Sequence, residues 1–593
     1  MRLFNTNYKV NIMIYFMDLE VYKDYFLCSF MREDGKIKHI EKYDGKFLDV
    51  QTISNIIRRS DSTIVTFNGN HYDMPILALA LDGATCAQIK ALSDSIIVDQ
   101  IKTWNLAQPS CDHIDLREIA PGVAGLKLYG ARLNAQKLKD LPIDPSASIS
   151  ANDREELKTY CENDLRLTES LYNFLIPQID LRRKLTEKYT VDMRSKSDAQ
   201  IAEGIIRKYL KDKGVTARKR ETEVKPFQYN VPDWVQFKSV EFSDMLQKVK
   251  DCTFEVNDKG SVVMPAELNK AVEYNGAKYK FGIGGLHSQE KKQVIKPNND
   301  EVFGEFDVAS MYPSIIIEQN LYPLHLGNKF LDVYSTIKDE RLVAKRAKDK
   351  VKDSTYKIVL NGSYGKFGSR YSFLYSPELM IQTTITGQLS LLMLIEKMTL
   401  AGGKVYSANT DGVNVLFDKA IESDIFSVQL DWELTTGYEL EFTKYKGTYS
   451  RDVNNYIAIT EYGVKGKGAF AIGGLSKNPS NTICVEAVIH HLTTGDDIAS
   501  YIEGNDDITK YITARTVNGG AVFRGEEVGK AIRFYHSTDG DTINYKKNGN
   551  KVPMSDGCKP LMDLPVSFPV DVDKEWYMSE AIKMLGLLGV THA

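Results

Sequence analysis

The N-terminal part of the chain alternates between short apolar runs and longer segments with a helical period. Residues 11–30 form two apolar runs around a polar break, which predicts a strand, a turn and a second strand. Residues 63–81 predict a strand, a polar loop and a helix, and residues 150–175 predict a helix capped by Ser150 or Asn152. Strands that alternate with helices in this way predict an N-terminal α/β unit.

The middle of the chain is less regular. Residues 181–214 predict two helices, and the Pro- and Asn-containing breaks at 225–234 and 296–300 are candidate boundaries. From 301 to 475 the pattern indicates strands and helices in irregular alternation. Within it, the basic run at 338–357 is typical of a solvated helix face.

Three segments of the second half combine a regular pattern with one polar group. Residues 404–417 predict a hairpin around an Asn-Thr-Asp-Gly turn, with Asp411 at its tip. Residues 306–316 read as an apolar, strand-like run, and its single acid, Asp307, is either exposed at an edge or held by a partner or metal. Residues 357–368 read as a helix that begins at a lysine suited to a phosphate.

Composition narrows the class of protein. A chain of 593 residues is too long for one core and predicts three or more domains. The net charge is −4, so a nucleic-acid surface requires local basic patches. The seven cysteines include no Cys-x-x-Cys pair, which indicates reduced thiols of a cytoplasmic protein outside any zinc site or disulfide. The apolar start is too short to span a membrane and reads as a strand.

Acidic residues of the N-terminal unit are spaced so that they can meet. Asp18 and Glu20 leave the same face of a strand, Asp73 ends the polar loop, and Tyr160 and Asp164 share one helix face. Converging carboxylates repel one another unless hard divalent cations neutralise them, and two such cations can activate a water. Tyr160 could orient that water. Taken singly, each acid is read more readily as a solvated surface residue, because motifs of this length are common.

The order of these motifs resembles that of family B DNA polymerases with a proofreading 3′→5′ exonuclease. Asp-x-Glu, Asn-x4-Asp and Tyr-x3-Asp resemble the exonuclease motifs, and the later segments resemble polymerase motifs A, B and C. The resemblance implies a multidomain α/β and α+β fold, with an RNase H-like exonuclease domain followed by a right-hand polymerase. It places the exonuclease at 1–185, a connecting segment and the start of the palm at 186–300, the palm at 301–329 and 373–475, the fingers at 330–372, and the thumb at 476–593.

The same resemblance assigns roles to residues, with two Mg²⁺ ions per active site and Mn²⁺ as an alternative. The exonuclease metal ligands would be Asp18, Glu20, Asp73 and Asp164, with Tyr160 catalytic. The polymerase metal ligands would be Asp307 and Asp411, with the carbonyl of Val308 as a lesser candidate. Tyr312 would pack under the sugar and exclude ribonucleotides. The nucleotide would also meet Lys357, either Arg341 or Lys345, and Asn361, Tyr364 and Gly365.

The resemblance also implies contacts with the primer-template at Asn68, Gly284, Gly285, Tyr456, Lys465 and Lys467. The glycine pair reads equally as a flexible turn, and the two lysines read equally as part of a solvated loop.

The chain departs from the family pattern in motif C, where Asn409 stands for the usual first acid, and in motif B, where Gly362 stands for the usual serine. Only 49 residues separate Asp307 from Lys357, which leaves room for a two-helix fingers hairpin and no large insertion. We therefore expect a compact viral, bacteriophage-like replicative polymerase.

Such an enzyme would act on primer-template DNA and dNTPs in the host cytoplasm. We expect a monomer that does not associate with a membrane. A helicase, primase or clamp stays open as a further partner. The alternatives are a nuclease or a DNA-binding protein with an inactive polymerase half, and a primer-independent polymerase.

Overall fold

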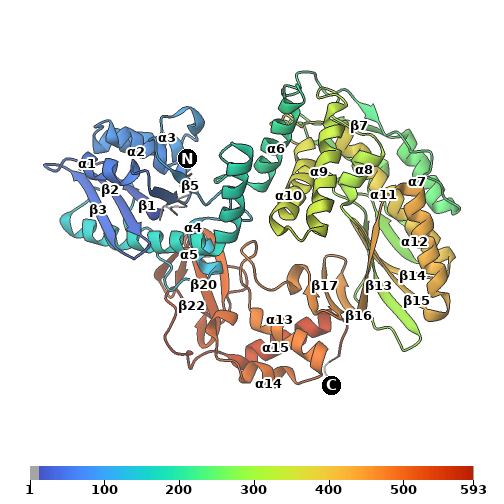
Figure 1. Cartoon of the computed structure of the whole chain (residues 1–593). Helices are drawn as coiled ribbons and strands as arrows, with labels where there is room; N and C mark the ends of the chain where they lie inside the picture. Colours follow the sequence, from blue (N-terminus) through green and yellow to red (C-terminus); the bar gives the residue numbers. More distant parts are fainter. Residues whose placement is uncertain (1–11, 592–593) are drawn as a thin grey trace, which may run out of the picture. The chain divides into compact units, whose positions relative to one another are not determined.

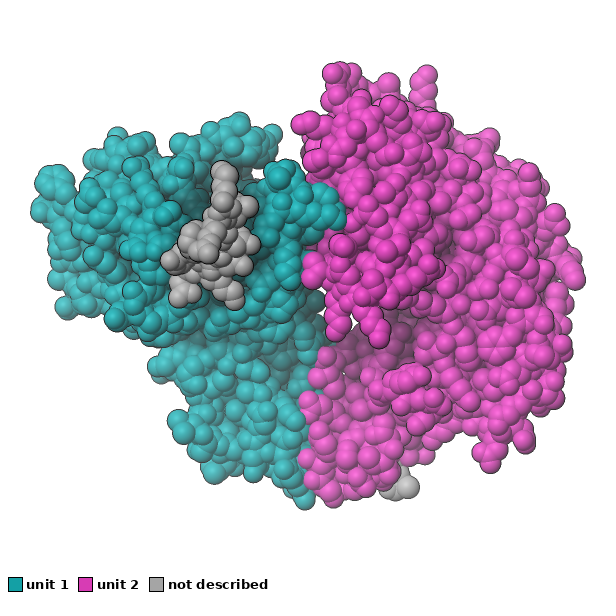
Figure 2. Space-filling model, in the orientation of Figure 1, with its two compact units in different colours: residues 1–197, 473–483, 502–578 teal, residues 198–472, 484–501, 579–593 magenta. Residues whose placement is uncertain are grey.

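The structure is a computed structural model that describes residues 12–591. The chain divides into two compact units, coloured separately in Figure 2, and each is described by itself. Unit 1 comprises 1–197, 473–483 and 502–578, and unit 2 comprises 198–472, 484–501 and 579–593.

Unit 1 contains a five-stranded sheet with the order β3-β2-β1-β4-β5 (Figure 1). Its first three strands, β1 (Met13–Val21), β2 (Tyr25–Arg32) and β3 (Ile37–Tyr43), form an antiparallel meander. β4 (Ser62–Thr66) pairs parallel to β1, and β5 (His113–Asp115) pairs parallel to β4. This order and these directions are those of an RNase H-like sheet, as the resemblance implied.

Helices cover both faces of this sheet, so the alternate apolar residues of β1 enter two different cores. One core joins the sheet to the first three helices, and the other joins it to the long fifth helix. The helices are α1 (Val50–Ile57), α2 (Asp73–Leu81), α3 (Cys86–Ile97), α4 (Leu126–Arg132) and α5 (Ala151–Tyr189). Of the two predicted caps for α5, Ser150 is the one found, in a reciprocal capping box with Asp153.

A second sheet of unit 1, with the order β21-β19-β20-β22, comes from the C-terminal part of the chain. It packs on α4, where Ala514 shares a buried cluster with Leu128 and Leu138. The buried Arg533 guanidinium donates to four backbone carbonyls there, including that of Ala135 at 2.6 Å. The strands are β19 (Thr513–Phe523), β20 (Glu526–Asp541), β21 (Asn544–Tyr545) and β22 (Cys558–Pro560).

Unit 2 is built on a ten-stranded sheet with the order β18-β17-β16-β13-β15-β14-β11-β10-β9, in which β12 also pairs with β16. The strands are β9 (Val272–Tyr274), β10 (Ala277–Lys280), β11 (His287–Ser288), β12 (Gln293–Ile295), β13 (Glu301–Val308), β14 (Lys404–Asn409), β15 (Gly412–Asp418), β16 (Leu440–Asp452), β17 (Asn455–Thr460) and β18 (Val464–Gly466). The predicted hairpin at 404–417 is confirmed as β14 and β15.

Helices α6, α9 and α10 of unit 2 pack side by side (Figure 1). The helices of this unit are α6 (Asp198–Asp212), α7 (Val240–Asp251), α8 (Met311–Glu318), α9 (Lys329–Arg346), α10 (Lys350–Phe367), α11 (Pro377–Leu400) and α12 (Glu422–Thr436). A small sheet comprises β6 (Phe227–Gln228), β7 (Thr253–Val256) and β8 (Val262–Val263). Three later helices run across unit boundaries, namely α13 (Thr482–Thr494), α14 (Ile498–Glu503) and α15 (Lys574–Leu587).

The prediction of one strand-like run at 306–316 is wrong. β13 ends at Val308, the backbone turns through the left-handed region at Ser310 (φ 51°), and α8 begins at Met311. Pro313 suits the first turn of a helix because the amide it lacks has no intrahelical partner there. The predicted helix at 357–368 is confirmed, and the basic run at 338–357 is divided between α9 and α10.

One helix in the described part of the chain, α11, is long and apolar enough to span a membrane by length and composition alone. Within its most apolar window 89% is buried inside the protein, so it is a core helix of unit 2. Six of the seven cysteines are buried, and Cys111 is partly exposed.

Candidate active sites

The structure brings the four predicted exonuclease acids together in unit 1. Asp18 and Glu20 lie on β1, Asp73 begins α2, and Asp164 lies on α5. Three of them are almost fully buried, with exposures of 7% for Glu20, 4% for Asp73 and 8% for Asp164. Burial raises the pKa of Asp18 to about 7, and repulsion from Asp164 adds to this effect. Burial also raises the pKa of each of the other three carboxyls.

A cysteine joins this cluster, which the sequence analysis did not foresee. The ligand atoms of Asp18, Glu20 and Cys161 all lie within 4.8 Å of one another. The Cys161 thiol donates to Asp18 Oδ2 at 3.5 Å. Its position directly after Tyr160 on α5 was the available signal, because the two residues lie about a quarter of a helical turn apart.

Tyr160 lies at the same site, and its partner is a lysine that the sequence analysis missed. Lys127 Nζ donates to the Tyr160 hydroxyl, lies 4.4 Å from the centre of its ring, and is 3.8 Å from Asp140 Oδ1. The charge of Lys127 lowers the pKa of Asp18 and of Asp164, against the effect of burial. A single lysine on the short helix α4 carries no sequence signal for this role.

The loop before Asp73 is held by a buried carboxylate, Asp115, at the end of β5. Asp115 is 0% exposed and accepts hydrogen bonds from the backbone amides of Asn68 (2.8 Å), Asn70 (3.0 Å) and Arg117 (3.0 Å). Asn68 itself has left-handed backbone (φ 72°), and its side-chain oxygen accepts from Arg117. Asp115 therefore fixes the turn that delivers Asp73 to the cluster.

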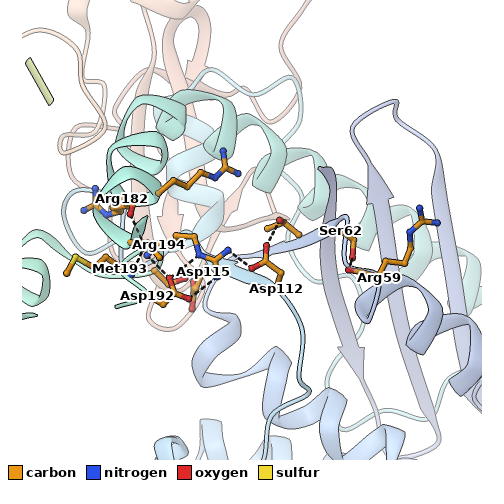
Figure 3. A network of polar contacts seen from close by, with 12 residues as sticks. Arg59, Ser62, Asp112, Asp115, Arg182, Asp192, Met193 and Arg194 are labelled. Carbon is orange, nitrogen blue, oxygen red and sulfur yellow. Dashed lines mark hydrogen bonds and ion pairs between the residues drawn. The ribbon is translucent and has the colours of Figure 1, made fainter. Parts of the chain in front are cut away.

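Figure 3 shows Asp115 within a wider network of polar contacts in unit 1. Arg194 pairs there with Asp112 and, at 2.9 Å, with Asp192, and the Asp115 amide donates to the Ser195 hydroxyl at 2.8 Å. This network ties the end of β5 to the segment that follows α5.

In unit 2, Asp307 lies near the end of β13 and Asp411 directly precedes the paired strand β15, so the two residues are neighbours in the structure. Asp307 pairs with Gly412 in the β13–β15 register, and the Val308 amide donates to the Asp411 carbonyl at 2.8 Å. Burial, and then repulsion from Asp411, raises the pKa of Asp307 to about 7. Burial likewise raises the pKa of Asp411, and the nearby lysines 465 and 467 lower it.

A third acid, Glu305, lies beside this pair and was not among the predicted residues. It stands two positions before Asp307 on β13, so both side chains leave the same face of the sheet. Tyr445 donates its hydroxyl to Glu305 Oε2 at 2.5 Å, and Lys465 Nζ is 3.5 Å from the same oxygen. The signal in the sequence was the two-residue spacing, the same that marked Asp18 and Glu20.

The predicted nucleotide-binding residues of motif B lie on α10. Lys357, Asn361 and Gly365 share its exposed face, four residues apart. A Cβ at Gly362 would lie 3.2 Å from the Asp198 carbonyl oxygen, so α10 approaches α6 closely at this departure from the family pattern.

The two basic candidates on α9 have different partners. Arg341 donates to the Ser310 hydroxyl at 2.6 Å and pairs with Asp353 at 3.1 Å. Lys345 is more exposed and lies 3.4 Å from Glu441. Arg341 thus contacts the turn after Asp307, whereas Lys345 contacts the strand beside it.

Tyr312 stacks on Tyr364, with ring centroids 4.0 Å apart and an interplanar angle of 18°. Its hydroxyl donates to the Gly284 carbonyl. This bond joins α8 to the loop that carries Gly284 and Gly285, which we call the glycine loop. Gly285 has φ 149°, and a Cβ there would lie 3.0 Å from Thr410, so this position requires glycine. The glycine loop therefore lies directly against the turn that carries Asp411.

Of the remaining predicted DNA contacts, Tyr456 and Lys465 lie on the neighbouring strands β17 and β18, and Lys467 lies directly after β18. The Lys467 amide donates to the Tyr456 carbonyl of β17 at 2.9 Å. Asn409, at the end of β14, donates its side-chain amide to the Val453 carbonyl at 3.3 Å.

Known proteins that are similar to this chain include DNA polymerases. No protein-family model matches the chain. Over 240 residues the chain is 28% identical to DNA polymerase 1 of Aeropyrum pernix, a stretch that covers 34% of this chain and only 24% of that polymerase. Part of this chain is therefore similar in sequence to a DNA polymerase. A solved family B DNA polymerase from the hyperthermophilic archaeon Pyrobaculum calidifontis aligns with 97% of this chain and 78% of its own, at 14% identity and a TM-score of 0.42.

Proposed function

We propose that the chain is a template-directed DNA polymerase of the family B type that extends a primer with dNTPs and carries a 3′→5′ exonuclease. The observation that carries this proposal is the meeting of acids far apart in the sequence at two places, Asp307 with Asp411 in unit 2 and Asp18 with Asp164 in unit 1. The sequence similarity to a DNA polymerase supports it.

Both clusters have the donors that a pair of Mg²⁺ ions needs. Their oxygens are hard ligands, and their mutual repulsion is the kind that divalent cations relieve. When bound, such ions lower the pKa of an attacking hydroxyl or water and stabilise charge on the phosphate. In unit 2, Asp307 and Asp411 would hold them. In unit 1, Asp18, Glu20, Asp73 and Asp164 would hold them.

The other residues of unit 2 would bind and orient the substrates. Lys357 on the exposed face of α10 would pair with the triphosphate, and Arg341 lies beside the turn after Asp307. The stacked ring of Tyr312 offers a flat surface for the sugar of the nucleotide. The glycine loop and Lys465 would contact the phosphates of the primer-template.

In unit 1, Tyr160 and Lys127 would serve the hydrolysis. The Tyr160 hydroxyl, held by Lys127, would orient the attacking water, and the lysine charge would stabilise the phosphate as negative charge grows on it. A role in replicating a compact viral genome is part of this proposal, and the order and spacing of the motifs support it.

Primer extension with Mg²⁺ tests the polymerase. We expect the full chain to extend a 5′-labelled primer on a template with dNTPs and to shorten it when dNTPs are withheld. Shortening without extension would indicate a nuclease with an inactive polymerase half, and neither activity would indicate a DNA-binding protein. Synthesis on a template without a primer would indicate a primer-independent enzyme.

The double variant Asp18→Ala/Glu20→Ala tests the exonuclease. It should lose degradation of single-stranded DNA and retain extension, since these acids belong to unit 1. Glu162→Gln is the matched control on α5, because Glu162 pairs with His39 at 3.1 Å. Undiminished degradation in the double variant would overturn the assignment.

A further inference from the structure

We propose that Glu305 is a third carboxylate of the polymerase metal site, acting with Asp307 and Asp411 to hold divalent cations. The inference rests on the proposed polymerase function and adds a residue that the motifs do not contain.

Carboxylate oxygens of Glu305 and Asp307 lie close to Gly412. A Cβ placed on Gly412 would lie 3.1 Å from Glu305 Oε1 and 3.2 Å from Asp307 Oδ1. The two carboxylate oxygens therefore border the same small space above Gly412, which is the cross-strand partner of Asp307. Because Gly412 directly follows Asp411, this space lies next to the tip of the hairpin.

The other oxygen of Glu305 is anchored, which directs Oε1 towards this space. Oε2 accepts the 2.5 Å hydrogen bond from Tyr445 and lies 3.5 Å from Lys465 Nζ. The Glu305 side chain is only 18% exposed. A carboxylate held on one side by two donors is pre-oriented, so it loses little side-chain entropy when a cation binds.

The electrostatic role follows from the charges that face the site. Glu305 Oε1 and Asp307 Oδ1 border the same space, and Lys465 Nζ lies 3.5 Å from the other oxygen of Glu305. Glu305 offsets the charge of Lys465, so the two negative charges of Asp307 and Asp411 remain for the cations. Glu305 thus keeps enough negative charge at the site for two dications.

The test measures cation binding directly. All proteins carry Asp18→Ala/Glu20→Ala, so that the acids of unit 1 contribute little to binding. Free Mn²⁺ is measured by electron paramagnetic resonance with a dideoxy-terminated primer-template and the next dNTP. We expect Glu305→Gln to weaken Mn²⁺ binding roughly tenfold, since it removes a unit charge from a partly buried site. The same variant should need more Mg²⁺ for half-maximal extension of a normal primer.

Three further variants make the result specific. Glu305→Asp keeps the charge and should bind Mn²⁺ within about threefold of the parent, which is less than a 1 kcal/mol change. Tyr445→Phe removes the anchor and should fall between Glu305→Gln and the parent. Glu301→Gln is the matched control, because Glu301 lies on the same face of β13 at its far end, and it should bind like the parent.

Two results would overturn the inference. One is parental Mn²⁺ binding in Glu305→Gln while Asp411→Asn loses it. The other is an equal loss in Glu305→Gln and Glu305→Asp, which would mean that charge at this position is not what matters. Failure of the parent itself to extend primers would instead count against the proposed function.

Discussion

The backbone amide of Val308 donates a 2.8 Å hydrogen bond to the backbone carbonyl of Asp411. This single bond fixes the end of β13 to the tip of the β14–β15 hairpin, so Asp307 and Asp411 face the same space although 103 positions separate them in the numbering. Neither side chain has to move far to share a ligand. The arrangement explains why the tip of an ordinary hairpin can carry chemistry.

Asp411 and Asn409 lie two residues apart in this turn, and we expect their substitutions to differ sharply. Asp411→Asn removes a charge from the metal site and should lower the single-turnover incorporation rate about a thousandfold, or roughly 4 kcal/mol. Asn409→Ala removes two hydrogen bonds, one donated to the Val453 carbonyl and one accepted from the Thr410 hydroxyl, and should cost about 1–2 kcal/mol. Rates are measured at saturating Mg²⁺. Equal losses in the two variants would mean that the metal ligand has been misplaced.

Tyr312 is expected to select the sugar of the nucleotide through its ring. Its ring is held in place by stacking on Tyr364, and its hydroxyl is held by the Gly284 carbonyl. Tyr312→Ala should raise incorporation of ribonucleotides relative to deoxynucleotides by at least about tenfold, because a factor of ten requires only about 1.4 kcal/mol of discrimination.

Tyr312→Phe is the matched control, since it keeps the stacked ring and loses only the hydroxyl. It should retain most of the sugar selectivity in single-nucleotide incorporation assays. An unchanged ratio in Tyr312→Ala would show that this residue does not select the sugar.

The structure brings together acids that the sequence singled out, because strand and helix periods place side chains on a common face. Asp18 with Glu20, and Tyr160 with Asp164, needed only such local geometry. The same rule could have found Glu305 from its spacing to Asp307, had the strand been read as beginning at Glu301 instead of Phe306.

Lys127 and Asp115 could not be predicted in the same way. Each contacts its site through tertiary packing between elements far apart in the sequence, as Lys127 on α4 does with Tyr160 on α5. The end of β13 was missed for a related reason. A short apolar run suits a buried strand and a buried helix equally, and packing decides between them.

Asp115 is expected to support exonuclease activity indirectly, because it holds the loop of Asn68 that precedes Asp73. In the unchanged protein, backbone amides donate to both carboxylate oxygens of Asp115. In Asp115→Asn the side-chain NH₂ group replaces one of these oxygens and must face a backbone N–H. One buried donor is then unsatisfied, which should cost about 1–3 kcal/mol of unfolding free energy. Exonuclease activity should fall because Asp73 loses its fixed position, while primer extension should change little.

Asp112→Asn provides the comparison for that variant. Asp112 lies three residues earlier, and its side chain is 38% exposed where it pairs with Arg194. Asp112 also accepts from the Thr63 hydroxyl, and asparagine keeps one acceptor oxygen for that bond, so this variant should lose only about 1 kcal/mol. Urea unfolding and degradation of single-stranded DNA separate the two variants. Equal stability and equal exonuclease activity in both would show that Asp115 holds nothing essential.

The exonuclease acids also predict how stability depends on pH in the metal-free protein. The pKa of Asp18 is about 7 in the folded protein, against 3.8 for a free carboxyl, chiefly because of burial. A raised pKa means that the folded state binds the proton more tightly than the unfolded state. The resulting stabilisation is full below about pH 4 and is lost as the pH rises through 7.

With EDTA present, the melting temperature should therefore fall between pH 5 and pH 8, and Asp18→Asn should reduce that fall. One pKa unit corresponds to about 1.4 kcal/mol, so Asp18 alone accounts for a few kcal/mol. Mg²⁺ at pH 8 should restore much of the loss, since cations neutralise the same carboxylates. Differential scanning calorimetry measures each condition. A melting temperature in EDTA that is independent of pH, or equally dependent on it in Asp18→Asn, would contradict the strained, buried carboxylate cluster on which the exonuclease assignment depends.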